Sequence, residues 1–131
     1  VCVLTNPTNL GHLYVEQVRD KIKWLNNYVT WLDIKTQFIA IPGPKRNIIE
    51  TIRKPKNQPI TMHDILIDDW NPNLNTWNQA GGLALKYCNG INSPNIKNPD
   101  TSYNGLHLTV EMSADDILEL LTMLESTHTY L

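Results

Sequence analysis

The chain has 131 residues, of which 41% are apolar and 18% charged, so it can bury a core and extended disorder is not expected. Its formal net charge of -2 argues against binding of a nucleic-acid polymer, which requires a basic surface. No apolar run approaches the roughly 20 residues of a membrane helix, so no membrane partner is expected. Two cysteines without metal-ligand spacing favour a reducing, cytoplasmic location. The length predicts a single domain, residues 1–131.

In the first half of the chain, apolar runs alternate with amphipathic segments. Residues 1–5 and 37–41 predict strands, each followed by a turn that contains proline. Residues 13–29 predict a helix whose core-facing stripe is formed by Val15, Val18, Ile22, Leu25 and Val29. Trp24 on this helix is expected to pack against the sheet. A short helix is predicted at residues 45–52.

The second half repeats the alternation. Strands are predicted at residues 64–68, 83–87 and 106–112, and helices at residues 71–79 and after Ser113. Ser113 is a suitable N-cap, and the following Asp115 and Asp116 suit the positive end of a helix. Residues 88–105 predict a long loop. Strands that alternate with helices predict a mainly parallel sheet in a Rossmann-like, three-layer α/β sandwich.

Two adjacent carboxylates end the apolar run at residues 65–67. Asp68 and Asp69 therefore lie at the carboxyl end of a predicted parallel strand, the edge at which open α/β sheets bind ligands. Because neighbouring carboxylates repel each other unless a cation or a proton intervenes, the pair predicts a Mg²⁺ site. The alternative is that the pair belongs to the N-terminal cap of the next helix.

Residues 68–82 form the stretch DDWNPNLNTWNQAGG, and residues 83–92 form LALKYCNGIN. Together they resemble the haloacid dehalogenase-like (HAD) superfamily, and more narrowly its 5'-nucleotidase-type members. Val3-Leu4-Thr5 is similar to the second motif of that superfamily, and Lys23-Trp24-Leu25 is similar to the helix that follows it. The resemblance covers most of the chain and implies a HAD-like fold.

The resemblance also implies roles for individual residues. The Thr5 hydroxyl and the Asn6 backbone N–H would bind the transferring phosphoryl group, and Lys45 would offset its charge as a catalytic lysine. Lys54 and Lys56 are alternatives to Lys45, because the loop length is uncertain. Asp68 would bind Mg²⁺ directly, and Asp69 would do so through water or by orienting the other ligands.

The chain departs from this family pattern at its start. The Asp-x-Asp motif that supplies the family's nucleophile and general acid/base is absent before Thr5. The nearest similar segment begins at Asp33, but it lacks the second Asp and follows Thr5 in the chain instead of preceding it. The strand that carries this motif would be central in the sheet, between the strands that end at Thr5 and Asp68. We therefore expect an upstream segment, a partner chain or second copy that completes the sheet, or re-paired strands. The missing initiator Met favours the first.

Two functions follow as hypotheses. The first is the rear portion of a Mg²⁺-dependent phosphohydrolase, a HAD-like phosphatase that acts on a small phosphomonoester such as a nucleoside monophosphate. It would be an enzyme only if the missing nucleophile is supplied. The alternative is a catalytically inactive HAD-like protein that binds a nucleotide or a protein partner.

Overall fold

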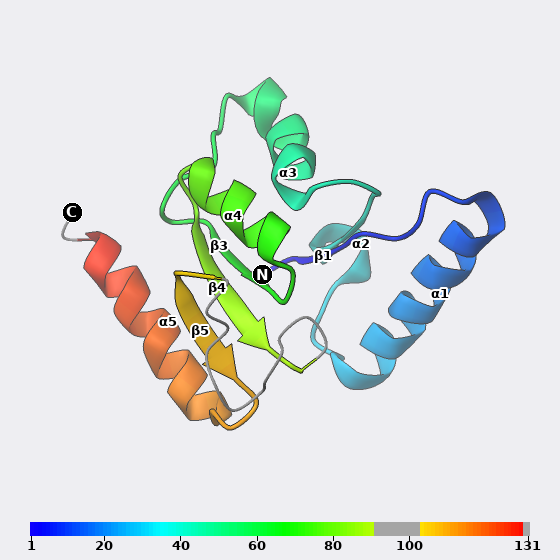
Figure 1. The fold of residues 1–131 in the computed structure, drawn as a ribbon. Helices are drawn as coiled ribbons and strands as arrows, with labels where there is room; N and C mark the ends of the chain where they lie inside the picture. The colour runs from blue at the N-terminus through cyan, green and yellow to red at the C-terminus, as the bar shows by residue number, and fades with distance from the viewer. Residues whose placement is uncertain (91–102, 130–131) are drawn as a thin grey trace. The chain divides into compact units, whose positions relative to one another are not determined.

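A computed structural model describes residues 1–90 and 103–129, so most of the predicted loop at residues 88–105 lies outside the described residues. The chain divides into two compact units, Val1–Ile48 and Ile49–Leu131, which are described one at a time below (Figure 1). The prediction of a single domain is not tested by this division and stays a prediction.

The first unit contains a small parallel sheet and the helix that connects its two strands. Its elements are β1 (Val3–Thr5), α1 (Gly11–Tyr28), α2 (Ile34–Gln37) and β2 (Phe38–Ala40). The two strands pair in parallel, with Val3 opposite Phe38 and Thr5 opposite Ala40. The sequence did not predict α2, a single turn whose N-cap residue is Asp33; the Asp33 carboxylate accepts a hydrogen bond from the Lys35 N–H.

The core-facing stripe of α1 differs from the prediction at one position, and the separate packing prediction for Trp24 differs as well. Leu25 is buried as expected, but Val15 is 50% exposed and Trp24 is 53% exposed. Tyr14 is half-buried instead, and its hydroxyl donates a hydrogen bond of 2.8 Å to the Ala40 carbonyl at the end of β2. A side chain that is partly polar thus occupies the place predicted for Val15, and the packing role predicted for Trp24 is wrong.

The second unit is built around a three-stranded parallel sheet in the order β3-β4-β5. The helix α3 (Lys45–Arg53) crosses the boundary between the units and is followed by the 3-10 turn η1 (Lys54–Lys56). The remaining elements are β3 (Ile65–Asp68), α4 (Asn71–Gln79), β4 (Leu83–Cys88), β5 (Leu106–Thr109) and α5 (Ala114–Thr129).

The core of the second unit lies between the sheet and α4. Its buried members are Ile60, Leu66, Leu74, Trp77, Ala84 and Tyr103. Trp77 is 5% exposed, and its indole N–H donates to the Asp64 carbonyl at 3.0 Å, so the single polar group of the ring is satisfied. Gly81 follows α4 with a φ of +98°, which lets the chain reverse into β4 as the sequence predicted.

An ion pair joins the end of α3 to the start of β3. The Arg53 guanidinium donates two hydrogen bonds to the Asp64 carboxylate, at 2.8 and 2.7 Å. Asp64 also accepts the Thr61 N–H at 2.9 Å. The guanidinium is the main reason why the pKa of Asp64 lies below its usual value; burial opposes this shift, and the Thr61 N–H adds to it.

The described strand pairs are parallel, and helices separate the consecutive strands from β1 to β4, so the α/β class predicted from the sequence is confirmed. They form two small sheets, and among the described residues β1 and β3 each have a single strand neighbour.

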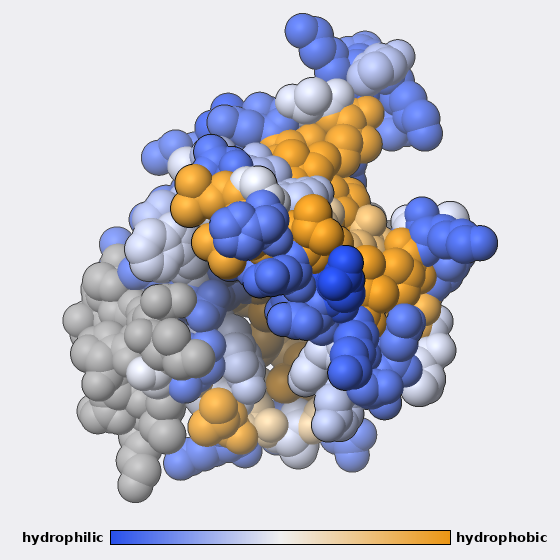
Figure 2. Space-filling model, turned by 90° about the vertical axis from the view of Figure 1, so that its right-hand side faces the viewer, coloured by the Kyte–Doolittle hydropathy of each residue, from blue (hydrophilic) through white to orange (hydrophobic). Residues whose placement is uncertain are grey.

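Figure 2 shows apolar side chains gathered on parts of the surface. Within the described part of the chain, no helix is both long and apolar enough to cross a membrane.

Candidate functional site

Asp68 ends β3 and is buried, with 7% of its surface exposed. The burial follows from the alternation of side chains along the strand. Leu66 and Asp68 are buried on the face that packs against α4, whereas Ile67 on the other face is 44% exposed. A carboxylate therefore takes the last position of an otherwise apolar row, where it must be satisfied by hydrogen bonds.

The Asp68 carboxylate organises the turn between β3 and α4. Its Oδ1 accepts the Trp70 backbone N–H at 2.9 Å, and its Oδ2 accepts the Asn73 amide N–H at 3.1 Å. Trp70 is the N-cap residue of α4 and Asn73 lies in the first turn of that helix. The alternative interpretation of Asp68, a role at the start of the next helix, therefore describes part of what this side chain does.

Asp69 is half-buried and connects the same turn to the segment after β4. Its Oδ2 accepts the Asn89 amide N–H at 3.0 Å. Its backbone carbonyl accepts a hydrogen bond of 2.6 Å from the ammonium of Lys86 on β4. Asp69 is thus held at its carboxylate and at its peptide group by residues that lie 17 and 20 positions further along the chain.

Lys86 is fully buried, with 0% of its surface exposed. Besides the Asp69 carbonyl, its Nζ donates to the Asn71 Oδ1 at 2.6 Å. Lys86 is the register partner of Asp68 in the parallel pair β3-β4, so the two side chains lie on the same face of the sheet. We refer to Asp68, Asp69, Asn71, Asn73, Lys86 and Asn89 as the acidic-turn cluster.

Sequence reasoning missed the asparagines and the lysine of this cluster. Lys86 was assigned only to a strand. The available signal was a lysine in the middle of the run LALKYC, where the flanking apolar residues already indicated a strand buried on both faces. A lysine is almost never fully buried unless it is paired, so the sequence pattern already indicated a hydrogen-bonding or charged partner for Lys86.

The donor atoms of the cluster suit a hard cation such as Mg²⁺. Mg²⁺ is usually held by one or two carboxylates together with water and phosphate oxygens, and Asp68 and Asp69 supply two carboxylates on adjacent residues. Within residues 1–90 and 103–126, no group of three or more His, Cys, Asp or Glu side chains could form a cage by itself. A Mg²⁺ ion at this pair would therefore need further oxygen ligands from water or from another molecule.

In the first unit, Thr5 and Asn6 line an open pocket of about 390 Å³. The other lining residues are Pro7, Gln17, Asp20, Lys21 and Trp24. Thr5 is half-buried at the end of β1, and Asn6 is exposed. Thr5 and Asn6 thus lie at a hollow, and phosphate binding by them stays a prediction. Lys45, half-buried at the first position of α3, does not line it.

The predicted site residues fall into two groups. Thr5, Asn6 and Lys45 belong to the first unit, and Asp68 and Asp69 belong to the second. A single site that contains both groups stays a prediction.

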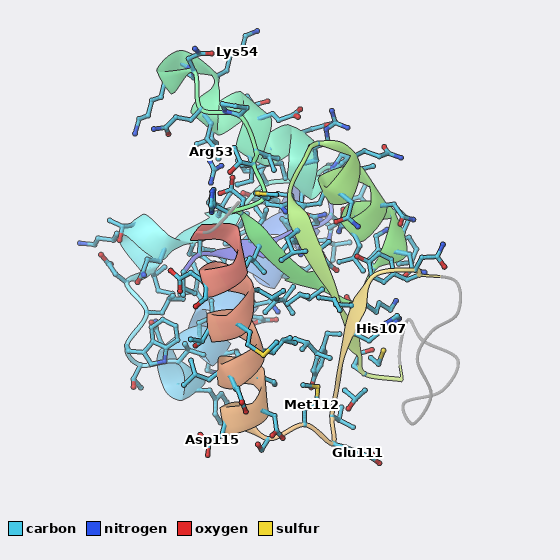
Figure 3. All side chains as sticks on the ribbon, turned by 90° about the vertical axis from the view of Figure 1, so that its left-hand side faces the viewer. Arg53, Lys54, His107, Glu111, Met112 and Asp115 are labelled. Atoms are coloured by element: carbon cyan, nitrogen blue, oxygen red, sulfur yellow. The ribbon has the colours of Figure 1, made fainter. Side chains whose placement is uncertain are left out.

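The two alternative lysines lie at the wrong end of β3. Lys54 and Lys56 are exposed and follow Arg53, which is paired with Asp64 just before β3 begins (Figure 3). A strand of four residues spans about 10 Å, and Asp68 stands at its opposite end. Lys54 and Lys56 therefore lie away from Asp68, and which of Lys45, Lys54 and Lys56 faces a phosphate stays a prediction.

Comparison of the chain with models of protein families, with curated proteins and with solved structures gave no match.

Proposed function

We propose that the chain forms part of a Mg²⁺-dependent phosphohydrolase with a HAD-like fold, acting on a small phosphomonoester such as a nucleoside monophosphate. The observation that carries this proposal is the acidic pair Asp68-Asp69 at the carboxyl end of a parallel strand, where hydrogen bonds from Trp70, Asn73 and Asn89 hold both carboxylates. Ligands of open α/β sheets bind at this edge.

Each residue has a distinct task in the proposed site. Asp68 and Asp69 would hold Mg²⁺, which when bound supplies positive charge next to the phosphoryl oxygens. The Thr5 hydroxyl and the Asn6 backbone N–H would donate hydrogen bonds to those oxygens. Lys45 would place an ammonium beside them, so that charge which develops during transfer is stabilised.

The nucleophile is not among the residues of this chain. The resemblance implies an aspartate on a central strand between β1 and β3, and each of these strands has one neighbour among the described strands. We propose that a segment outside the 131 residues provides this strand together with its Asp-x-Asp motif. The aspartate would attack phosphorus in line and displace the alcohol, and water would then release phosphate.

The proposal is tested by phosphatase assays on the complete natural protein. With Mg²⁺, hydrolysis of p-nitrophenyl phosphate and of a panel of nucleoside monophosphates is expected. Asp68→Asn should lower kcat/KM at least about 100-fold because one carboxylate charge at the metal is lost. Asp115→Asn, in the first turn of α5, is the control and should leave the rate unchanged. No Mg²⁺-dependent hydrolysis, or full activity of Asp68→Asn, would refute the proposal.

A second candidate function, a binding protein without catalysis, is favoured by β3, which has a single strand neighbour among the described residues. β3 is an edge strand of the three-stranded sheet, and Ile67 on it is 44% exposed. Exposed edges accept an added strand from a partner. A partner that co-purifies with a natural protein devoid of phosphatase activity, and that is lost when Ile67 is replaced by lysine, would support this candidate.

A further inference from the structure

The full burial of Lys86 requires an explanation. Transfer of an ammonium group from water into a protein interior costs several kcal/mol unless hydrogen bonds and opposite charge compensate it. On the same face of β4, the neighbouring Ala84 and Cys88 are 2% and 0% exposed, so the stem of Lys86 starts from an apolar row. An apolar residue of similar length would fill this space without the cost.

Two hydrogen bonds of the ammonium end on the acidic turn. One reaches the carbonyl of Asp69 and the other reaches the side chain of Asn71, both at 2.6 Å. Asp69 and Asn71 flank Trp70, whose N–H is bonded to the Asp68 carboxylate. The ammonium therefore holds the backbone carbonyl before Trp70 and the side chain of the residue after it.

We propose that Lys86 is a positioning residue for the acidic pair. Its ammonium holds the Asp69 peptide and Asn71 in place, and thereby sets the directions in which the Asp68 and Asp69 carboxylates face a bound cation. The metal-related part of this inference rests on the proposed function.

Substitutions at and around Lys86 separate the effects of its side-chain length, its charge and its hydrogen bonds on the acidic turn. Lys86→Met keeps an unbranched side chain of similar length but leaves the Asp69 carbonyl and the Asn71 Oδ1 without this donor. Asn71→Ala removes one of the two acceptors at a half-buried position and leaves the lysine in place. Lys23→Met, which removes an exposed lysine from α1 that does not line the pocket at Thr5, is the matched control for the loss of one positive charge.

The first readout is amide hydrogen exchange in the complete natural protein without metal. Lys86→Met should speed exchange of the Trp70 N–H at least about 10-fold, because the turn that holds it to Asp68 loosens. Exchange at Leu74 and Leu85, which are 0% exposed in the core, should change less than about 3-fold. Asn71→Ala should act in the same direction with a smaller effect.

The second readout is the Mg²⁺ concentration that gives half-maximal phosphatase activity. Lys86→Met should raise it at least about 10-fold, since misdirected carboxylates bind the cation more weakly, and Lys23→Met should leave it unchanged. A structural role alone would lower the melting temperature without changing this concentration. Lys86→Arg, which retains the charge, should recover part of the Mg²⁺ affinity.

The outcomes are distinguishable from failure of the proposed function. If the wild-type protein has no Mg²⁺-dependent activity, the proposed function fails, and the exchange data still decide whether Lys86 orders the turn. If Lys86→Met does not fold, Asn71→Ala decides it instead. Unchanged Trp70 exchange in the folded variant, or an unchanged Mg²⁺ requirement in an active one, would overturn the positioning role.

Discussion

The two units of the chain use the same pattern of strand, helix and parallel strand with different results. In the first unit, all residues of β1 and β2 are only half-buried. In the second unit, the central strand β4 contains four buried residues, Ala84, Leu85, Lys86 and Cys88. A two-stranded sheet is marginal alone, whereas three strands that pack against a helix can support a core.

This difference in burial determines whether the polar groups of each unit are buried or exposed to solvent. The second unit buries an aspartate and a lysine at the end of its sheet, next to a core of Leu66, Leu74 and Trp77 that stabilises them. The first unit instead offers Thr5 and Asn6 at an open pocket, where solvent can satisfy them. The proposed cation ligands therefore lie next to a buried core, and the proposed phosphate ligands lie in a less buried unit.

The largest expected effect distinguishes two tryptophans, one in each unit. Trp77→Ala should destabilise the protein by about 3–5 kcal/mol, because the indole is 5% exposed and its removal leaves a cavity in the core. Trp24→Ala, at a 53% exposed site in α1, should cost less than about 1 kcal/mol. Urea denaturation followed by circular dichroism measures both, and equal costs would contradict the stated difference between the units.

Low pH should weaken the second unit through the Arg53–Asp64 pair. The pKa of Asp64 is lower in the folded protein than in the unfolded chain, so its contribution to stability is present above the unfolded value of about 4. That contribution is lost as the pH falls through the folded pKa. The part of the acid-induced loss of stability that is due to this residue should be absent in Asp64→Asn.

At neutral pH, Asp64→Asn should cost about 1–2 kcal/mol, because the charge-assisted bonds to Arg53 are weakened while both side chains are only 31% and 21% exposed. Thermal melts at pH 7 and pH 3 measure the effect. Arg19→Gln, at an exposed position of α1, is a control outside this pair. An Asp64→Asn variant whose melting temperature falls with acid as steeply as that of the wild type would argue against this role.

The smallest predicted effect concerns the start of α5. The Ser113 hydroxyl accepts the Asp116 N–H at 3.1 Å, and the Asp116 carboxylate accepts the Ser113 N–H at 2.9 Å, which forms a reciprocal cap. These hydrogen bonds from Ser113 also lower the pKa of Asp116. Ser113→Ala should cost about 1 kcal/mol in a urea titration, and Ser126→Ala, late in the helix, should cost less. A larger loss in Ser126→Ala would contradict the capping role.

The order of helices and strands was largely predictable from local patterns, because apolar periodicity and turn residues act over a few positions. The cap at Ser113 and the reversal at Gly81 were predicted for the same reason. The errors at Val15 and Trp24 arose because several faces of α1 carry apolar residues, and the sequence alone does not show which face packs.

The site was only partly predictable. The position of Asp68 and Asp69 at the end of a strand follows from the local sequence. Lys86 could not be connected to them, because its contacts depend on the register of β3 against β4, and register is a tertiary property. The asparagines of the acidic-turn cluster were missed for the same reason, since Asn89 reaches Asp69 from 20 positions away.

Titration of the complete natural protein with Mg²⁺, followed by the backbone amide resonances, tests the central claim most directly. We expect saturable shifts of the Asp69, Trp70 and Asn89 amide resonances, which are absent in the Asp68→Asn variant and retained in the Asp115→Asn variant. Shifts that do not saturate, or that persist unchanged in Asp68→Asn, would contradict a Mg²⁺ site at the acidic turn.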